Sequence, residues 1–371
     1  MTAKQEATKN KLAFFAGNLF KKFGLPRLIL LLTLVAMFVV AWAIGMNTAH
    51  FFSSVLWRWG MLGILTLAMV PTIQSGIGPN FGISVGIVGG MLGAVLSIEL
   101  RYRGILDFIE NETWFAIGGA LMAIVMGVFV ATIMGVLYGM ILNRVKGSEM
   151  AISTYIGFSV VNLFNILWMT IPVTAGIMIL PGIGSGLRMV INLDDDFRHA
   201  FDSIWRFEVG GVTVRTGLLL VFFLVCFFMY LFTRSRIGMM LSAAGANPEY
   251  ARASGISVDK MRILGTTIST ALGGFGIVVY MQSFGFLQMY TAPLMMGFVT
   301  TAGVLIGGAT VRRARVFDAL FGALIFNGIL AIALPLITEI LPDAAGVPEM
   351  VRMIFTNGII LFALTRAKGG R

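Results

Sequence analysis

The chain has 371 residues, of which 58% are hydrophobic and only 12% are charged. Soluble domains average about 25% charged residues, so this composition excludes an ordinary soluble enzyme and indicates a polytopic membrane protein. The formal charge of +10 does not require a nucleic-acid partner, because the cytoplasmic loops of membrane proteins collect Lys and Arg.

The N-terminal segment, residues 1–27, is basic and amphipathic. Leu12, Phe15, Leu19 and Phe23 recur at helical spacing, and Lys residues border them. This pattern predicts an interfacial helix that lies on the cytoplasmic surface of the membrane. No small-residue cleavage site follows the first apolar run, so we do not expect a cleaved signal peptide.

Apolar runs long enough to cross a bilayer of about 30 Å fill most of the remaining chain. We expect ten transmembrane helices, near residues 28–46, 57–73, 80–100, 114–142, 150–171, 217–233, 262–282, 294–310, 316–336 and 350–365. In this topology most Lys and Arg lie inside the cell and most acidic residues outside. The sequence therefore predicts one all-α transmembrane permease domain over residues 28–366, with both termini and the tail at 367–371 in the cytoplasm.

Three further patterns refine this topology. The longest outer connection, residues 172–216, contains "RFEVGGVTVR", which predicts a short hairpin turning at Gly210 and Gly211. "IQSGIGPNFG" and "MQSFGFLQMY" match weakly and fall at opposite membrane faces, which indicates an inverted repeat of the kind common in transporters.

Small residues recur every four positions in two predicted helices, where they favour close helix packing within the chain over a dimerisation face. They are Gly82, Gly86 and Gly90 in one helix, and Gly127, Ala131, Gly135 and Gly139 in the other.

No motif for catalysis or nucleotide binding is present, because the sequence has no G-x-x-x-x-G-K-[ST]. Cys226 is the only cysteine, and His50 and His199 lie far apart, so we expect neither a disulfide nor a metal site. The predicted helix centres contain no ionisable residue, since Glu99 and Asp318 lie near helix ends, and this disfavours proton coupling. We therefore expect a chain that is not itself an enzyme and has no catalytic residues.

Neutral polar residues form a stripe on one face of the predicted fifth helix. The stripe consists of Tyr155, Ser159, Asn162, Asn165 and Trp168, spaced three or four residues apart. It either lines a pathway for an uncharged polar solute or makes hydrogen bonds between helices. Weaker pathway candidates of the same kind are Gln74, Asn80, Gln282, Gln288 and Asn327.

One long polar segment, "SAAGANPEYARASGISVDKMR" at residues 242–262, interrupts the apolar sequence. Asn247 is a good helix N-cap, Pro248 suits the first helical position, and the charge of Glu249 complements the helix dipole. Gly255 ends the helix, because glycine tolerates a positive φ. The segment is predicted to form a short helix on the cytoplasmic face.

The same segment resembles the cytoplasmic signature of ABC-importer permeases for ribose, branched-chain amino acids and nucleosides. The matching positions are Gly245, Asn247, Ala251, Gly255, Ile256, Val258, Lys260 and the stretch 271–276. The sequence "FVTTAGVLIGGATVRRARVF" is similar to the family's Gly-Gly segment, although "GGATVRRAR" departs from the usual "GGxxxxGGxG".

The resemblance implies that the short helix is a coupling helix, which docks into a cytoplasmic ABC ATPase through Asn247, Pro248, Glu249, Ala251, Arg252, Gly255 and Ile256. It also implies that ATP and Mg are bound by that partner and that this chain binds no cofactor. A second permease subunit, identical or homologous, an extracytoplasmic solute-binding protein and a location in the bacterial inner membrane are implied as well.

The resulting hypothesis is the translocation subunit of an importer for a small neutral polar solute, with a monosaccharide such as ribose preferred and a nucleoside next. Two alternatives stay open. One is an ion-coupled secondary transporter whose ion site consists of backbone carbonyls, and the other is a membrane scaffold that transports nothing.

Overall fold

The computed structural model describes residues 25–340, except 181–185 and 291, and scattered positions between 346 and 365. The predicted N-terminal interfacial helix and the C-terminal tail lie outside the described residues. The predicted tenth crossing, at 350–365, is described only at scattered positions.

Within the described part, the fold is a bundle of apolar helices with two small two-stranded sheets. The helices are α2 (Leu25–Ala43), α3 (Thr48–Leu67), α4 (Met69–Gln74), α5 (Ser84–Tyr102), α6 (Glu112–Arg144), α7 (Glu149–Leu167), α8 (Thr216–Arg234), α9 (Arg236–Ala246), α10 (Pro248–Ala253), α11 (Val258–Phe284), α12 (Ala292–Ile306) and α13 (Val316–Ile340). The strands are β1 (Val190–Asn192), β2 (Arg206–Val209), β3 (Val212–Arg215) and β4 (Phe286–Gln288).

Each of the nine crossings predicted before residue 340 coincides with an apolar helix in the structure. Of the described helices, seven are long and apolar enough to cross a membrane, counting α3 and α4 together, while α2 and α12 are shorter apolar helices. The prediction of an all-α polytopic membrane protein is therefore confirmed.

The second crossing begins earlier than predicted, at Thr48 rather than residue 57. Asn47 caps this helix, because its side chain accepts a hydrogen bond of 3.1 Å from the backbone N–H of His50. The polar residues of "AHFFSSVLWRWG" lower the hydropathy of the first turns without stopping the helix. Hydropathy alone therefore places this boundary too late.

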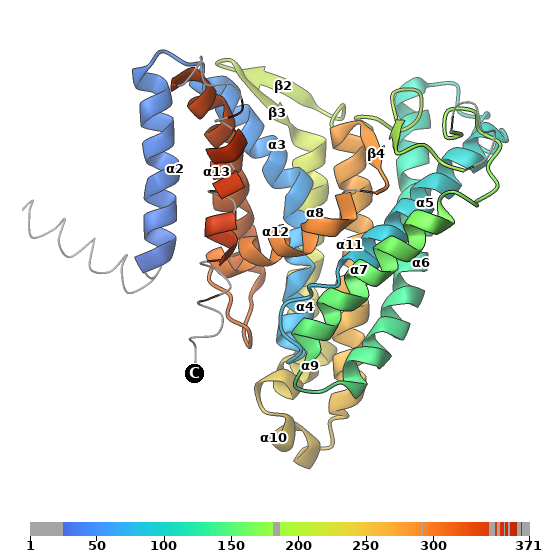
Figure 1. The fold of residues 1–371 in the computed structure, drawn as a ribbon, viewed down its shortest axis with the longest axis vertical. Coiled ribbons are helices and arrows are strands. Elements are labelled where there is room, and N and C mark those ends of the chain that lie inside the picture. The colour runs from blue at the N-terminus through green and yellow to red at the C-terminus, as the bar shows by residue number, and fades with distance from the viewer. Residues whose placement is uncertain are drawn as a thin grey trace, which may run out of the picture.

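Helices α5, α6 and α11 form the most closely packed part of the bundle (Figure 1). A Cβ atom added at Gly86 would lie 2.1 Å from the carbonyl oxygen of Thr270, and one at Gly90 would lie 2.4 Å from that of Gly274. A Cβ atom at Gly127 would lie 2.9 Å from the Cα of Gly90. The predicted small-residue stripes thus pack against helices of the same chain, which confirms the preference for packing within the chain.

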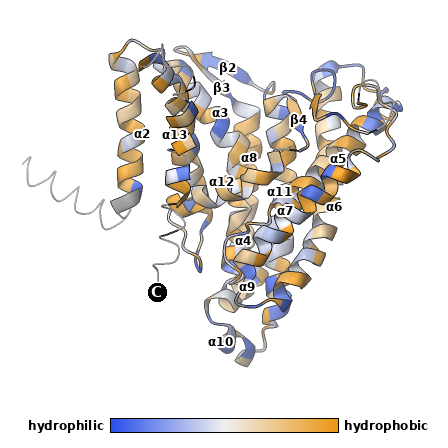
Figure 2. Ribbon diagram, in the orientation of Figure 1, coloured by the Kyte–Doolittle hydropathy of each residue, from blue (hydrophilic) through white to orange (hydrophobic). Residues whose placement is uncertain are grey.

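The polar parts of the chain lie at opposite ends of this bundle. Helices α9 and α10 lie at one end, whereas the β2–β3 hairpin and β4 lie at the other (Figure 1), and the helices between them are mainly hydrophobic (Figure 2). The predicted hairpin is confirmed, with Gly210 and Gly211 at φ values of 58° and 79°. We call the hairpin end the outer end, following the charge distribution of the sequence.

The outer end is tied to α11 through a short sheet. Strand β1 pairs antiparallel with β4, which follows α11 directly, so that Val190 lies opposite Gln288. This pairing fixes the long connection 172–216 to the end of α11. The two segments that suggest an inverted repeat also lie at opposite ends, because Gly76 contacts Gly245 of α9 whereas β4 is at the outer end. The repeat itself stays a prediction.

Candidate functional site

The polar segment 242–262 forms a short capped helix, as its sequence predicts. Asn247 accepts a hydrogen bond of 3.1 Å from the backbone N–H of Tyr250, and Pro248 occupies the first position of α10. The chain leaves the helix through Gly255, whose φ is +79° and whose surroundings are open. Local capping therefore determines this structure.

Most of the residues predicted to contact an ATPase are exposed on α10 and beside it. Asn247, Pro248, Glu249, Arg252 and Gly255 are exposed, and Ile256 is half-buried. Ala251, in contrast, is fully buried against Ala244 and Val258. Ala251 therefore supports the helix from inside and presents no surface for contact.

Sequence reasoning missed the most prominent side chain of this helix. The aromatic ring of Tyr250 is 69% exposed on α10, beside Glu249 and Arg252. Exposed aromatic side chains flanked by charges are typical anchors of protein interfaces. The signal was available in the sequence, since an aromatic residue in a polar helix has no apolar core to enter.

Two ion pairs connect the start of α11 with the turn between α6 and α7. Lys146 Nζ lies 2.7 Å from Asp259 Oδ1, in an exposed pair. Arg262 and Glu149 form a second pair, in which both side chains are largely buried. Because α11 follows α10 after a short loop, these pairs link the polar segment to α7.

The structure divides the stripe predicted on α7. Tyr155, Ser159 and Asn162 are exposed along the outside of the helix, with Tyr155 at 68%. Asn165 is half-buried, and its Oδ1 atom is buried without a hydrogen-bond partner among the described residues. Trp168 is fully buried and its ring lies 5.2 Å from that of Phe164. We call the three exposed residues, Tyr155, Ser159 and Asn162, the polar row.

Three of the weaker candidates make hydrogen bonds within the bundle. The side chain of Gln74 donates to the carbonyl oxygen of Ala314 at 2.9 Å, and that of Asn327 donates to Ala323 at 3.0 Å. Asn80 lies in the loop between α4 and α5, donates to Ser269 of α11 at 2.9 Å and accepts from the hydroxyl of Tyr138 of α6 at 2.9 Å.

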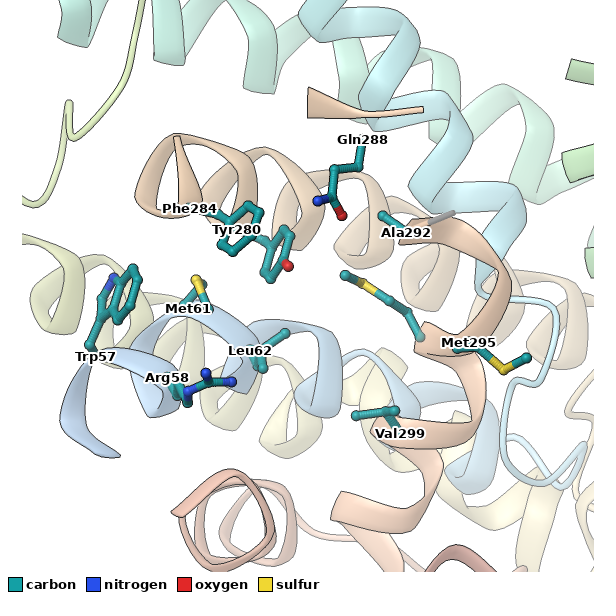
Figure 3. Close-up of a pocket in the computed structure, with 11 residues that line it drawn as sticks. Trp57, Arg58, Met61, Leu62, Tyr280, Phe284, Gln288, Ala292, Met295 and Val299 are labelled. Atoms are coloured by element: carbon teal, nitrogen blue, oxygen red, sulfur yellow. The ribbon is translucent and has the colours of Figure 1, made fainter. Parts of the chain in front are cut away.

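A fourth candidate, Gln288, borders a cavity of about 370 Å³ between α3, α11 and α12. Figure 3 shows the Tyr280 hydroxyl and the Gln288 amide directed toward the same space, with Arg58 and Leu62 on the α3 side. The other walls consist of aromatic, methionine and aliphatic side chains: Trp57, Met61, Phe284, Ala292, Met295, Met296 and Val299.

Comparison with known proteins identifies the family to which this chain belongs. A protein-family model described as "Branched-chain amino acid transport system / permease component" matches residues 51–364, which is most of the chain. The chain belongs to this permease family. The membership confirms the resemblance seen in the polar segment, and the family match includes the cavity, α10 and the helices of the bundle that follow α2.

Individual relatives are transport permeases. The permease is 31% identical over 153 residues to a nucleoside ABC transporter permease protein, NupB, of Lactococcus lactis, covering 40% of this chain and 38% of that protein. It is 30% identical over 125 residues to a fructose import permease protein, FrcC, of Rhizobium meliloti, covering 32% and 34%. It is 26% identical over 136 residues to a guanosine ABC transporter permease protein, NupQ, of Bacillus subtilis, covering 37% and 40%.

These alignments span 34% to 40% of the length of each relative. No solved structure matches the permease.

A buried carboxylate organises the outer end of the permease. Asp202, which is 3% exposed, accepts hydrogen bonds from Ser283 at 2.6 Å, Arg215 at 2.7 Å and Gln282 at 3.2 Å, and lies 3.2 Å from the His199 ring. Burial acts to raise the pKa of Asp202, but these partners together hold it below its ordinary value.

Gln282 is therefore a structural residue of this network. Its side-chain oxygen also accepts from the backbone N–H of Phe201 at 3.1 Å, which connects the end of α11 to the connection 172–216. The sequence suggests a pathway role for Gln282 because it does not show the partners of this side chain. Those partners come into contact with Gln282 only when the connection 172–216 folds over the end of α11.

Proposed function

We propose that this permease is the membrane-spanning subunit of an ATP-binding-cassette importer, driven by ATP hydrolysis on a separate cytoplasmic ATPase. Family membership and the exposed, capped helix α10 support this proposal together. The sequence carries no P-loop motif, so ATP and Mg would be bound by the partner. The observation that carries the proposal is α10 itself, which presents Tyr250 and Arg252 beyond the membrane helices.

The same geometry offers a route from ATPase to pathway. A force on α10 passes to α11, which contacts α5 and α6 along glycine positions. The Arg262–Glu149 and Lys146–Asp259 pairs carry the displacement to the base of α7. Closure of the ATPase would therefore move the helix that bears the polar row.

A second permease subunit would cover the polar row. Tyr155, Ser159 and Asn162 are exposed at membrane depth, where contact between polar side chains and lipid is unfavourable. If the same surface of an identical or homologous subunit lies opposite, the two rows form a polar path between the subunits. The acidic residues of the connection 172–216 would face a solute-binding protein at the outer surface.

The transported solute would be small, neutral and polar. The relatives include permeases named for nucleosides, fructose and guanosine, and the solutes in those names are all uncharged. Both the monosaccharide preferred from the sequence and the nucleoside alternative belong to this class.

Uptake into proteoliposomes tests the proposal. The permease, reconstituted with its ATPase and solute-binding protein, is expected to accumulate the solute only when the ATPase side receives ATP and Mg. Accumulation should persist after ionophores dissipate all ion gradients. Uptake that continues without ATP and stops when an ion gradient collapses would instead establish the secondary transporter and contradict the proposal.

Asn162→Leu tests the polar row. Loss of one polar contact in the path is expected to lower the rate of uptake about fivefold, since a hydrogen bond is worth about 1 kcal/mol and 1.4 kcal/mol corresponds to a factor of ten. The assembled complex should elute unchanged in size-exclusion chromatography. Thr154→Val is the matched control, because the Thr154 hydroxyl bonds only to Met150 of its own helix at 2.9 Å. If Asn162→Leu and Thr154→Val support equal uptake, the polar row serves helix packing and does not line the path.

A further inference from the structure

We propose that the cavity between α3, α11 and α12 is a binding site for a nucleoside, with the base against the aromatic wall and the ribose near Gln288. This inference rests on the proposed function, of which it names the solute class. Of the pathway candidates chosen from the sequence, only Gln288 borders the cavity, and the other residues that define it come from distant parts of the chain.

The cavity has the size and the wall that such a ligand requires. Its volume of about 370 Å³ lies within the range of small-molecule sites, about 300–1,000 Å³. Tyr280 and Phe284 lie one helical turn apart on α11, and their rings stack at 5.4 Å with an angle of 16°. These two rings form an aromatic wall, and Figure 3 shows Met61 between them and Trp57 of α3, which also lines the cavity. A planar base can stack on such a wall.

Two polar groups in the cavity are available to a ligand. Neither the Tyr280 hydroxyl nor the Gln288 amide makes a side-chain hydrogen bond with any residue that the structure describes. Both residues are half-buried, so their polar groups are accessible in the cavity and free to bond to a ligand that enters it. The β1–β4 pairing holds the backbone of Gln288 in place, which keeps its amide at the cavity.

The composition of the walls distinguishes between classes of solute. Arg58 is the only charged residue among the described lining residues, so a zwitterionic amino acid would find no carboxylate for its ammonium group. A monosaccharide carries hydroxyls on all sides, whereas Leu62, Met295 and Val299 make the opposite walls apolar. A nucleoside matches this division, because it has one flat aromatic part and one hydroxylated part.

The cavity also lies beside the proposed path. Phe298 of α12 contacts Phe158 of α7, with ring centroids 6.2 Å apart, so the helix that forms one wall also touches the helix with the polar row. Gln288 is in β4 at the outer end. A solute that enters from outside would therefore meet the cavity close to the path between the two subunits.

Equilibrium binding of radiolabelled adenosine to the purified full-length permease in nanodiscs tests this site without ATP. Adenosine is expected to bind saturably, and D-ribose to bind at least about tenfold more weakly because it lacks the base. Tyr280→Phe and Gln288→Leu should each weaken adenosine binding about fivefold, since each removes one hydrogen bond. Tyr280→Leu also removes the stacking surface and should have the largest effect.

Tyr230→Phe is the matched control, because it removes a hydroxyl from an exposed residue of α8, outside the cavity, and should leave adenosine binding unchanged. Equal binding of ribose and adenosine, or adenosine binding insensitive to both Tyr280→Phe and Gln288→Leu, would overturn the site. If these variants leave ATP-driven uptake unchanged, the nucleoside site is wrong and the importer function stands. If adenosine binds normally but uptake is not driven by ATP, the importer function is wrong and the nucleoside site stands.

Discussion

Tyr250→Ala and Arg252→Glu are each expected to weaken ATPase binding at least about 30-fold and, when combined, to abolish co-purification. Tyr and Arg are enriched among interface residues whose loss costs about 2 kcal/mol or more, which corresponds to this factor. Both side chains are exposed on α10, so neither substitution removes a contact in the membrane core.

Affinity purification of the ATPase with the tagged permease measures this effect, and thermal unfolding in detergent verifies that the permease is folded. Arg206→Glu is the matched control, because it makes the same charge change on exposed β2 at the opposite end of the molecule. Retention of the ATPase by the double variant would contradict the docking role of α10. Gly255→Glu is a less clean test, because the φ of +79° at this position adds backbone strain.

Gly86→Ala is expected to prevent the bundle from folding normally. The added Cβ would lie 2.1 Å from the carbonyl oxygen of Thr270, and a backbone atom cannot move aside as a flexible side chain can. Helices α5 and α11 would have to separate along their whole contact. We expect a loss of stability above about 3 kcal/mol, beyond the usual cost of overpacking.

Gly118→Ala provides the matched control for this prediction. Gly118 lies in α6, and its added Cβ would be 3.4 Å from Ile109 Cδ1, an ordinary van der Waals contact. This variant should be as stable as the original or gain up to about 1 kcal/mol from helix propensity. Fluorescence-detected size-exclusion chromatography with a temperature series compares the two. Similar melting temperatures for both variants would disprove the close approach of α5 and α11.

Local features of the chain were predictable because they depend on neighbouring residues. The capping of α10 by Asn247, the glycine that ends it, and the turn at Gly210 and Gly211 follow from short-range chemistry. The helical crossings follow from hydropathy, and the start of α3 was misplaced where polar residues continue an apolar helix.

Residues whose role depends on distant partners were harder to predict. Trp168 follows the spacing of the polar row, but it lies at the end of α7 and is buried in the core. Gln282 and Gln288 are six residues apart and look equivalent in the sequence. Only the fold shows that Asp202 binds the first and that the second borders a cavity, whose walls come from residues separated by more than 200 positions.

The glycine contacts among α5, α6 and α11 have a mechanical consequence. Where the backbones are in direct contact, few flexible side chains lie between the helices. Small sliding movements therefore cannot be accommodated by changes of side-chain rotamer. The spacing of one small residue per helical turn makes the next compatible register about 5.4 Å away. These three helices should therefore move as one rigid lever, with the shape change of each cycle concentrated in the loosely packed helices around them.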